Sequence, residues 1–213
     1  MSAIRGLYGI VDVSGNPGLD ELTLGRAWLA AGVSVLQLRM KAASDDAMRA
    51  VLRELAPRCV AAECALLVND RVHLAVEHPG VGVHLGQDDG DPQEARRVLG
   101  PDRVIGWSTH TVEQVRRAPS LGVDYIGYGP VFSAAAKHRA AGDTRTPMAA
   151  RGLAALSEAV AAATLPVVAI GGIDATRLPF VLATGVQSVA MISAVSQAED
   201  PRRAAVELAA ACR

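Results

Sequence analysis

Three polar side chains that could bind an anion lie close together near residue 40. Gln37, Arg39 and Lys41 alternate with apolar residues, so a β-strand would place all three on one face. Burying two cations and an amide costs desolvation free energy unless an anion pairs with them, and a phosphate or diphosphate pairs well. Alternatively, the run is an edge strand whose polar face meets water.

Two aspartates provide ligands that a divalent cation could use. Asp70 and Asp89 follow two apolar runs that are neighbours along the chain, at 65–69 and 82–85. Mg²⁺ is commonly held by one or two carboxylates together with phosphate oxygens of a substrate. Either aspartate alone could equally cap the N-terminus of a helix. Beside the cationic strand, the two together predict a metal site.

A second anion site is predicted near the end of the chain. Ile-Gly-Gly-Ile at 170–173 ends one apolar run and opens a helical pattern, and Met-Ile-Ser-Ala at 191–194 ends the next run. Gly171 and Gly172 would let backbone N–H groups approach a phosphate closely, as the last two strands of many barrel enzymes do. A tight turn or a helix start is the alternative for the glycine pair.

The chain alternates strand-like and helix-like segments throughout, and these must position the polar residues. Short β-branched runs predict strands at 7–13, 35–40, 65–69, 82–85, 103–108, 124–128, 166–170 and 188–192. Apolar residues spaced by three or four predict helices at 22–31, 44–63, 72–77, 92–99, 112–118, 152–163, 175–184 and 201–212. Pro57 is expected to kink or split the second helix.

This alternation predicts an α/β fold, a single-domain (β/α)8 TIM barrel that covers residues 1–213. The carboxyl ends of the strands carry the active site in such barrels. The predicted anion-binding and metal-binding residues all fall at those ends. They are therefore expected to face one another across the mouth of the barrel.

Composition excludes several classes of function. A net charge of -1 and 3% aromatic residues offer neither a basic field nor a stacking surface for nucleic acid. No apolar run reaches the roughly 18 residues of a membrane span, and the first residues lead into a predicted strand rather than a signal peptide. Cys59, Cys64 and Cys212 form no metal-binding motif. We expect a cytoplasmic protein with small-molecule partners, and a homo-oligomer is left open.

Seven motifs, in order along nearly the whole chain, resemble the thiamine phosphate synthase family. They are Gln-Leu-Arg-Met-Lys at 37–41, Val-Asn-Asp at 68–70, His-Leu-Gly-Gln-Asp-Asp at 84–89, Gly-Trp-Ser-Thr-His at 106–110, Gly-Tyr-Gly-Pro-Val-Phe at 127–132, and the two motifs at 170–173 and 191–194. The resemblance implies a transferase that joins hydroxymethylpyrimidine diphosphate to a thiazole phosphate and releases diphosphate, by a dissociative substitution.

The resemblance also implies roles for individual residues. Mg²⁺ would be bound by Asp70 and Asp89. Thiazole phosphate would be bound by Gly172, Ile192 and Ser193. The pyrimidine diphosphate would be bound by Gln37, Arg39, Lys41, Asn69, Ser108 and Lys137, and Arg39, Lys41, Ser108 and Lys137 among these would act in catalysis.

The chain departs from the family pattern after Phe132. Two threonines and a lysine are usual there, and the threonine hydroxyls reach the thiazole phosphate. In this chain Ser133, three alanines and Lys137 follow instead. Met40 also stands where a glutamate is common. These differences put the second substrate, or full activity, in question.

Three functions are therefore considered. The favoured one is an active synthase. The second is a related thiazole tautomerase or another phosphate-handling barrel enzyme, in which His110 would transfer a proton. The third is a catalytically silent protein that binds thiamine phosphates as a regulator. In a synthase we expect His110 to cap the following helix, and the carboxylates Asp70 and Asp89 favour the synthase over the tautomerase.

Overall fold

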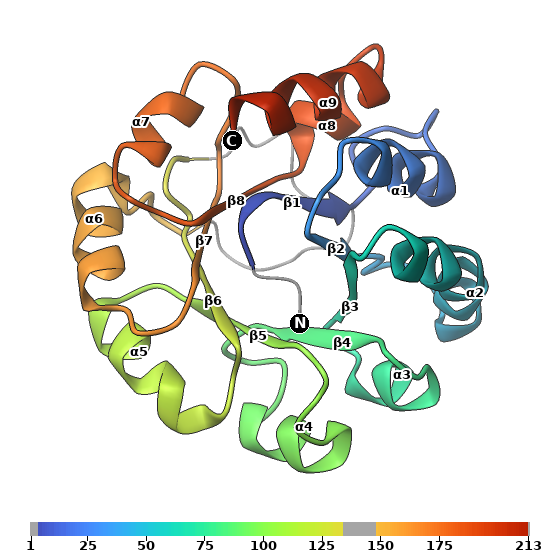
Figure 1. Cartoon of the computed structure of the whole chain (residues 1–213), viewed down its shortest axis with the longest axis horizontal. Helices are drawn as coiled ribbons and strands as arrows, with labels where there is room; N and C mark the ends of the chain where they lie inside the picture. Colours follow the sequence, from blue (N-terminus) through green and yellow to red (C-terminus); the bar gives the residue numbers. More distant parts are fainter. Residues whose placement is uncertain (1–3, 134–147, 213) are drawn as a thin grey trace.

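Eight parallel strands close into a barrel, and the helices form a ring around it (Figure 1). The computed structural model describes residues 4–133 and 148–212. Each strand pairs with the next along the chain, and β8 closes the barrel on β1. The predicted (β/α)8 barrel is confirmed. The strands are β1 (Gly6–Val11), β2 (Val35–Leu38), β3 (Ala65–Asn69), β4 (Gly82–Leu85), β5 (Ile105–Thr109), β6 (Tyr125–Tyr128), β7 (Val167–Ile170) and β8 (Ser188–Met191).

The helices cover the outside of the barrel, and several begin at side chains that accept hydrogen bonds from the first turn. Asp20, Ser44, Asp91, Thr111 and Asp200 cap helices in this way. The helices are α1 (Glu21–Ala30), α2 (Asp45–Ala61), α3 (Val72–Glu77), α4 (Pro92–Leu99), α5 (Val112–Arg117), α6 (Gly152–Ala162), α7 (Leu178–Leu182), α8 (Ser193–Ser196) and α9 (Pro201–Ala211), with a 3-10 turn at Ala118–Leu121.

Of the two effects expected of Pro57, a kink or a split of the helix, the split is wrong. α2 runs unbroken from Asp45 to Ala61 with Pro57 inside it. Proline removes one backbone hydrogen bond from a helix, but α2 buries Leu52 and Leu55 completely against the core. Burial of that face supplies more free energy than one hydrogen bond, so the helix continues.

The segment after β7 also differs from the prediction. α7 begins at Leu178 rather than near residue 175, because the carboxylate of Asp174 accepts hydrogen bonds from the backbone N–H groups of Thr176 and Arg177 and holds a turn there. Gly171 and Gly172 therefore lie in a loop and do not open a helix directly. The short helix α8, after β8, is not in the predicted set.

Side chains of each strand alternate between the barrel interior and the layer under the helices. The alternative of a water-facing edge strand for β2 is excluded, because β2 pairs with β1 on one side and β3 on the other. Its polar side chains therefore point into the barrel. An apolar cluster fills the interior below them, made of Tyr8, Ile10, Val35, Leu67, Tyr125, Val168 and Ala190.

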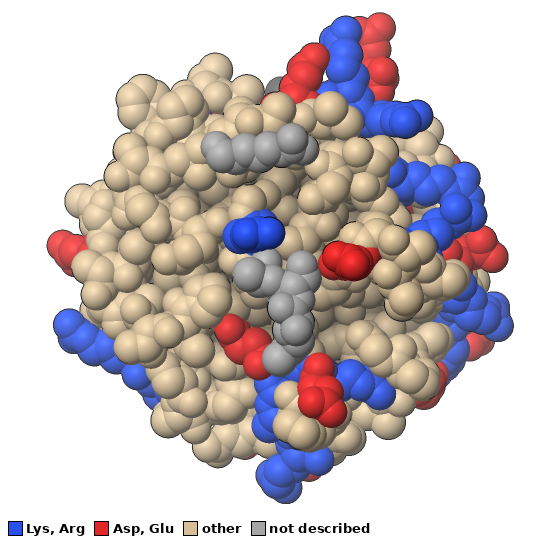
Figure 2. Space-filling view, viewed as in Figure 1, with Lys and Arg blue, Asp and Glu red and all other residues tan. Residues whose placement is uncertain are grey.

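Charged side chains are unevenly distributed around the rim. In the view of Figure 2 they gather along the right side and the bottom, where α2, α3 and α4 lie in Figure 1, with further groups at the top right and lower left, and few appear at the upper left, where α7 lies. No helix in the described ranges is long and apolar enough to cross a membrane.

Candidate active site

A pocket at the carboxyl ends of the strands brings together the polar side chains that the sequence singled out. Its lining includes residues from the ends of β2 and β3, from β5 and from the loop after β4: Gln37, Arg39, Lys41, Asn69, Asp70, Asp89 and Ser108. Lys137 lies outside the described residues. The other predicted site residues, Gly172, Ile192 and Ser193, line a second pocket. The two pockets share Ile170, Ala190 and Ile192, so they are neighbours.

Two aspartates and a lysine lie close together in the first pocket. Lys41 Nζ is 3.3 Å from Asp70 Oδ2, and Asp89 lines the same pocket. Burial raises the pKa of the Asp70 carboxyl; the nearby Lys41 ammonium opposes that rise and Asp89 adds to it. Asp70 also adopts φ +66°, which costs free energy for a non-glycine residue.

Neither aspartate serves as a helix cap. Asp91, rather than Asp89, caps α4, and the residue before α3 is Arg71, whose side chain makes no capping bond. The Asp89 carboxylate instead accepts a hydrogen bond from the N–H of Gly86 at 3.2 Å. The capping alternative is therefore wrong for both aspartates, and their carboxylates face the pocket.

The pair of carboxylates fits a cation that takes most of its ligands from elsewhere. The described part of the chain contains no group of three or more His, Cys, Asp or Glu side chains that could hold a metal. Mg²⁺ keeps several waters and binds through one or two carboxylates plus substrate phosphates, so Asp70 and Asp89 suit it when a diphosphate is also bound.

Asp12 is a site residue that sequence reasoning missed. It follows β1 at the same end of the barrel, is 4% exposed, and forms an ion pair with Arg39. Its carboxylate also accepts hydrogen bonds from the hydroxyl and the N–H of Ser14, at 2.5 and 3.1 Å. A buried carboxylate without a partner is costly, so Asp12 and Arg39 fix each other. The signal in the sequence is a lone aspartate near the end of the first apolar run, 7–13.

The floor of the first pocket contains further polar side chains that sequence reasoning passed over. Tyr8, His84 and Tyr125 are hydrogen-bonded inside the barrel, between Gln37 and Ser108. Burial lowers the pKa of His84 to about 4, and the nearby Asp89 opposes that shift. Burial also raises the pKa of Tyr8 and of Tyr125 well above the usual range.

Glycines make room for this floor. A Cβ at Gly106 would lie 2.1 Å from Tyr125 Cζ, and a Cβ at Gly127 would lie 3.3 Å from His84 Cε1. Both glycines are on strands, where a larger inward side chain would displace an aromatic ring. Gly106 and Gly127 are therefore required because their missing side chains leave room for the aromatic rings, and not because of backbone flexibility.

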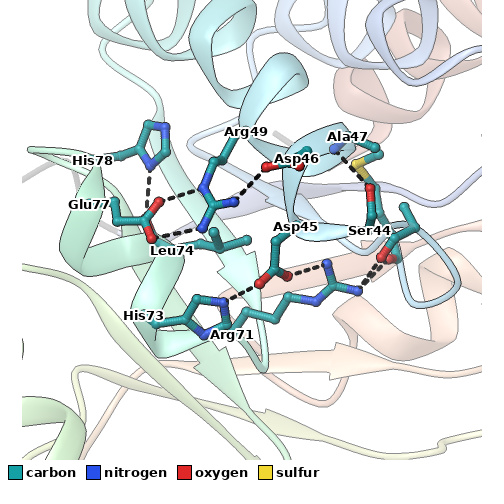
Figure 3. Close-up of polar contacts among 12 residues, drawn as sticks. Ser44, Asp45, Asp46, Ala47, Arg49, Arg71, His73, Leu74, Glu77 and His78 are labelled. Carbon is teal, nitrogen blue, oxygen red and sulfur yellow. Dashed lines mark hydrogen bonds and ion pairs between the residues drawn. The ribbon is translucent and has the colours of Figure 1, made fainter.

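An ion-pair network joins α2 and α3 beside the pocket (Figure 3). Asp45 accepts hydrogen bonds from Arg71 at 2.9 Å and His73 at 2.7 Å. Arg49 pairs with Glu77 at 2.6 Å and with Asp46 at 2.8 Å. Of the two arginines, Arg71 also reaches the backbone of the loop that carries Lys41, so this part of the network supports the site.

His110 has a structural position that differs from the expected one. Thr111 caps α5, so the prediction that His110 caps it is wrong. The Nδ1–H of the His110 ring is placed to donate to the carbonyl of Gly129 at 2.6 Å, and its backbone N–H donates to Gln114 Oε1 at 2.6 Å. His110 thus ties the end of β5 to the end of β6, and it is not among the residues that line the first pocket.

The second pocket combines a glycine turn, a hydroxyl and a cation. Gly171 and Gly172 have φ of +105° and +61°, and a Cβ at Gly172 would meet the carbonyl oxygens of Phe132 and Ser133 at 2.9 Å. Arg177, which sequence reasoning missed, lines this pocket. Its guanidinium donates to the Gly172 carbonyl at 2.5 Å and lies 4.9 Å from the centre of the Phe132 ring.

Comparisons with known proteins agree with one another. A family model described as thiamine monophosphate synthase matches residues 7–195. The chain is 40% identical, over 208 residues, to the thiamine-phosphate synthase of Anaeromyxobacter dehalogenans (strain 2CP-C), covering 98% of this chain and 88% of that protein. The solved structure of thiamine phosphate pyrophosphorylase from Pyrococcus furiosus matches with a TM-score of 0.83 and 33% identity, covering 97% of this chain and 95% of that one.

Some relatives are much longer. The chain is 40% identical over 196 residues to the thiamine-phosphate synthase of Synechococcus sp. (strain CC9311), which covers 92% of this chain but 53% of that protein. The chain thus spans about half the length of such relatives.

Proposed function

Because the chain belongs to the thiamine monophosphate synthase family, we propose that it is a thiamine-phosphate synthase. It couples hydroxymethylpyrimidine diphosphate with hydroxyethylthiazole phosphate and releases thiamine phosphate and diphosphate. The observation that carries the proposal is the convergence of Arg39, Lys41 and Ser108 with the carboxylate pair Asp70 and Asp89 in one pocket, next to a second pocket with its own cation.

The reaction breaks one bond and forms another. The carbon–oxygen bond between the pyrimidine methylene and the diphosphate breaks, and its electron pair leaves on the diphosphate. The lone pair of the thiazole nitrogen then forms the new carbon–nitrogen bond at that methylene. No strong base is required, so the task of the protein is to bind the leaving anion, orient both rings and exclude water.

Cationic and neutral donors of the first pocket suit the leaving diphosphate. Lys41 lies at the mouth, 23% exposed in its side chain, and Arg39 is held by Asp12. A fixed donor costs little reorganisation when charge develops on the leaving group. Lys41, Arg39 and Ser108 would therefore stabilise the growing negative charge, and Gln37 and Asn69 would orient the pyrimidine. Lys137 is proposed for the same anion on family resemblance alone.

Asp70 and Asp89 are proposed as the ligands of Mg²⁺. The bound ion would supply positive charge next to the leaving diphosphate. The contact between Lys41 and Asp70 supports this placement, because it brings a protein cation and the proposed metal ligands to the same anion. A cytoplasmic location and a homo-oligomeric state stay predictions.

The second pocket is proposed to hold the thiazole phosphate. Gly172 provides a glycine turn, Ser193 a hydroxyl and Arg177 a positive charge. Arg177 offers a bidentate, permanently charged donor for a phosphate, and this chain lacks the two threonines that the family uses there. Arg177 would thus replace part of the missing recognition.

A coupling assay tests the proposed function directly. Purified protein, both substrates and Mg²⁺ should give thiamine phosphate and diphosphate in equal amounts, and omission of either substrate should abolish both products. Lys41→Met should lower turnover by at least about 100-fold, as loss of a donor to developing charge does. Absence of thiamine phosphate from a folded wild-type protein at saturating substrates would contradict the proposal.

A further inference from the structure

An unbroken line of hydrogen bonds crosses the barrel beneath the first pocket. Gln37 Nε2 donates to the hydroxyl of Tyr8 at 2.9 Å, and the hydroxyls of Tyr8 and Tyr125 are 2.7 Å apart. His84 Nδ1 lies 2.8 Å from the Tyr125 hydroxyl, and His84 Nε2 lies 2.9 Å from Ser108 Oγ. The line joins two residues that are proposed to contact the same substrate.

The orientation of the Gln37 amide sets the direction of the protons along this line. The amide nitrogen of Gln37 can only donate, so the Tyr8 oxygen accepts and its single proton is available for Tyr125. Among the described residues, Gln37 and Tyr125 are the hydrogen-bond partners of the Tyr8 hydroxyl. The proton of Tyr125 then goes to Nδ1 of His84. A neutral imidazole that accepts at Nδ1 carries its proton on Nε2.

The last step concerns Ser108. The Nε2–H of His84 donates to Ser108 Oγ. The Ser108 hydroxyl therefore accepts this hydrogen bond, and its own proton is not donated to His84. We propose that Tyr125 and His84 are positioning residues that hold Ser108 as a hydrogen-bond donor to the anion in the pocket. This inference rests on the proposed function, since the anion is the diphosphate of the substrate.

The direction matters because a hydroxyl has one proton and two lone pairs. If Ser108 donated to His84, it would turn lone pairs toward the diphosphate and repel it. Donors that are already oriented toward developing charge lower a barrier without reorganisation. Gly106 and Gly127 leave the space that the rings of Tyr125 and His84 occupy, so the strands are built to accommodate this line.

One rearrangement reverses the line. If the amide of Gln37 turned by 180°, its oxygen would accept from Tyr8, and every later donor would become an acceptor. His84 would then carry its proton on Nδ1, and Ser108 would donate to Nε2. The two directions differ in one measurable property, the tautomer of His84.

Nuclear magnetic resonance of protein labelled with ¹⁵N-histidine measures that tautomer. The chain has five histidines, and the signals of His84 are identified by their loss in His84→Gln. The expected result is a protonated Nε2 and an unprotonated Nδ1 in the wild-type protein at neutral pH. A protonated Nδ1 with an unprotonated Nε2 would overturn the proposal. This measurement needs no substrate, and a variant is used only to assign the signals.

Two tyrosine variants separate the positions along the line. Tyr125→Phe removes the proton that His84 Nδ1 accepts, so both tautomers should become populated. In Tyr8→Phe the Tyr125 hydroxyl can still donate its hydrogen bond to His84 Nδ1, so the His84 tautomer should stay as in the wild type. An unchanged tautomer in Tyr125→Phe, or a changed one in Tyr8→Phe, would contradict the proposed direction.

Calorimetry with inorganic diphosphate and Mg²⁺ tests the consequence at Ser108. Ser108→Ala should weaken diphosphate binding roughly 10- to 100-fold, the range for a hydrogen bond to a charged group. Tyr125→Phe should weaken binding in the wild-type background but have no further effect in Ser108→Ala. Equal losses in both backgrounds would show that Tyr125 acts independently of Ser108.

Failure of this inference is distinguishable from failure of the proposed function. A protein that forms thiamine phosphate but shows the Nδ1-protonated tautomer of His84 is a synthase in which the hydrogen bonds do not have the proposed direction. A protein with the Nε2-protonated tautomer and coupled diphosphate binding, but without thiamine phosphate formation, retains the line while losing the function. Each result is read from a separate measurement.

Discussion

The guanidinium of Arg71 donates a hydrogen bond of 2.7 Å to the carbonyl of Ala43. It also contacts the carbonyls of Met40 and Lys41, at 3.2 and 3.4 Å. Arg71 directly follows Asp70 in the chain. One side chain therefore fastens the loop that carries Lys41 to the strand end that carries Asp70, and it stabilises the 3.3 Å contact between those two residues.

Replacement of Arg71 should impair catalysis more than stability. Lysine keeps the charge, but its single ammonium cannot replace the planar fork that reaches Asp45 and the loop carbonyls. A displacement of about 1 Å in a catalytic group can cost roughly 100-fold in rate. We expect Arg71→Lys to lower kcat at least about 10-fold with little change in KM for thiazole phosphate, measured by steady-state kinetics.

Arg49→Ala is the matched control for Arg71. Arg49 forms ion pairs with Glu77 and Asp46 on the same side of the barrel (Figure 3) and makes no recorded bond to the loop that carries Lys41 within the described residues. Its loss should leave kcat unchanged. Equal effects of the two substitutions on kcat would mean that Arg71 acts only through general stability.

The proposed metal ligands predict a contrast between adjacent residues. Asp89→Asn should lower turnover by about 100-fold or more and raise the Mg²⁺ concentration needed for half-maximal rate, because an amide is a weaker ligand than a carboxylate. Asp88, the neighbouring residue, is exposed. Asp88→Asn should leave both quantities unchanged. Undiminished turnover of Asp89→Asn at saturating Mg²⁺ would remove Asp89 from the metal site.

The sequence predicted the barrel well because its pattern is local. Strands β3 and β4 match their predicted bounds, and so do helices α3 and α4. Short apolar runs and helical spacing specify such elements directly. α7 is shorter than predicted because Asp174 holds a turn before it, and Pro57 does not split α2 because burial stabilises that helix. Both errors involve side-chain contacts that a periodic pattern does not contain.

The site was predictable only where its residues stand in recognisable motifs. Gln37, Lys41, Asp70 and Ser108 lie in such motifs, and the structure places them in one pocket. Tyr8, Tyr125 and Asp12 are isolated polar residues in apolar runs, and nothing in their local sequence indicates a partner. Tyr8 pairs with Tyr125, and Asp12 with Arg39, and the members of each pair lie far apart in the chain, so only the closed barrel brings these pairs together.

Gly106 provides a test of how tightly the barrel interior is packed. A Cβ at this position would lie 2.1 Å from Tyr125 Cζ and 2.3 Å from its hydroxyl oxygen. Gly106→Ala should therefore displace a buried ring and lower the free energy of unfolding by about 1–3 kcal/mol, measured by urea denaturation. At Gly18, by contrast, the nearest atom to an added Cβ would be the Asn16 side-chain oxygen, at 3.5 Å. Gly18→Ala should be nearly neutral, and an equal loss at both positions would contradict the packing argument.

Arg177 gives the sharpest test of the second pocket. Arg177→Ala should raise KM for hydroxyethylthiazole phosphate roughly 10- to 100-fold, the range for loss of a hydrogen bond to a charged group. The same change should barely affect KM for the unphosphorylated alcohol, if the wild-type protein accepts that alcohol at high concentration. The measurement is the ratio of kcat/KM for the thiazole phosphate to kcat/KM for the unphosphorylated alcohol, in wild type and variant.

The ratio separates phosphate recognition from support of the loop. Arg177 also contacts the Gly172 carbonyl and the Phe132 ring, so its loss could disturb the pocket as a whole. A disturbed pocket would impair both thiazoles equally and leave the ratio unchanged, and that result would exclude Arg177 as the phosphate ligand. Arg97→Ala removes an exposed arginine that pairs with Glu94 on α4. This control should leave kcat/KM unchanged for both thiazoles. A ratio that falls only in Arg177→Ala would show that this cation supplies phosphate recognition where the family's two threonines are missing.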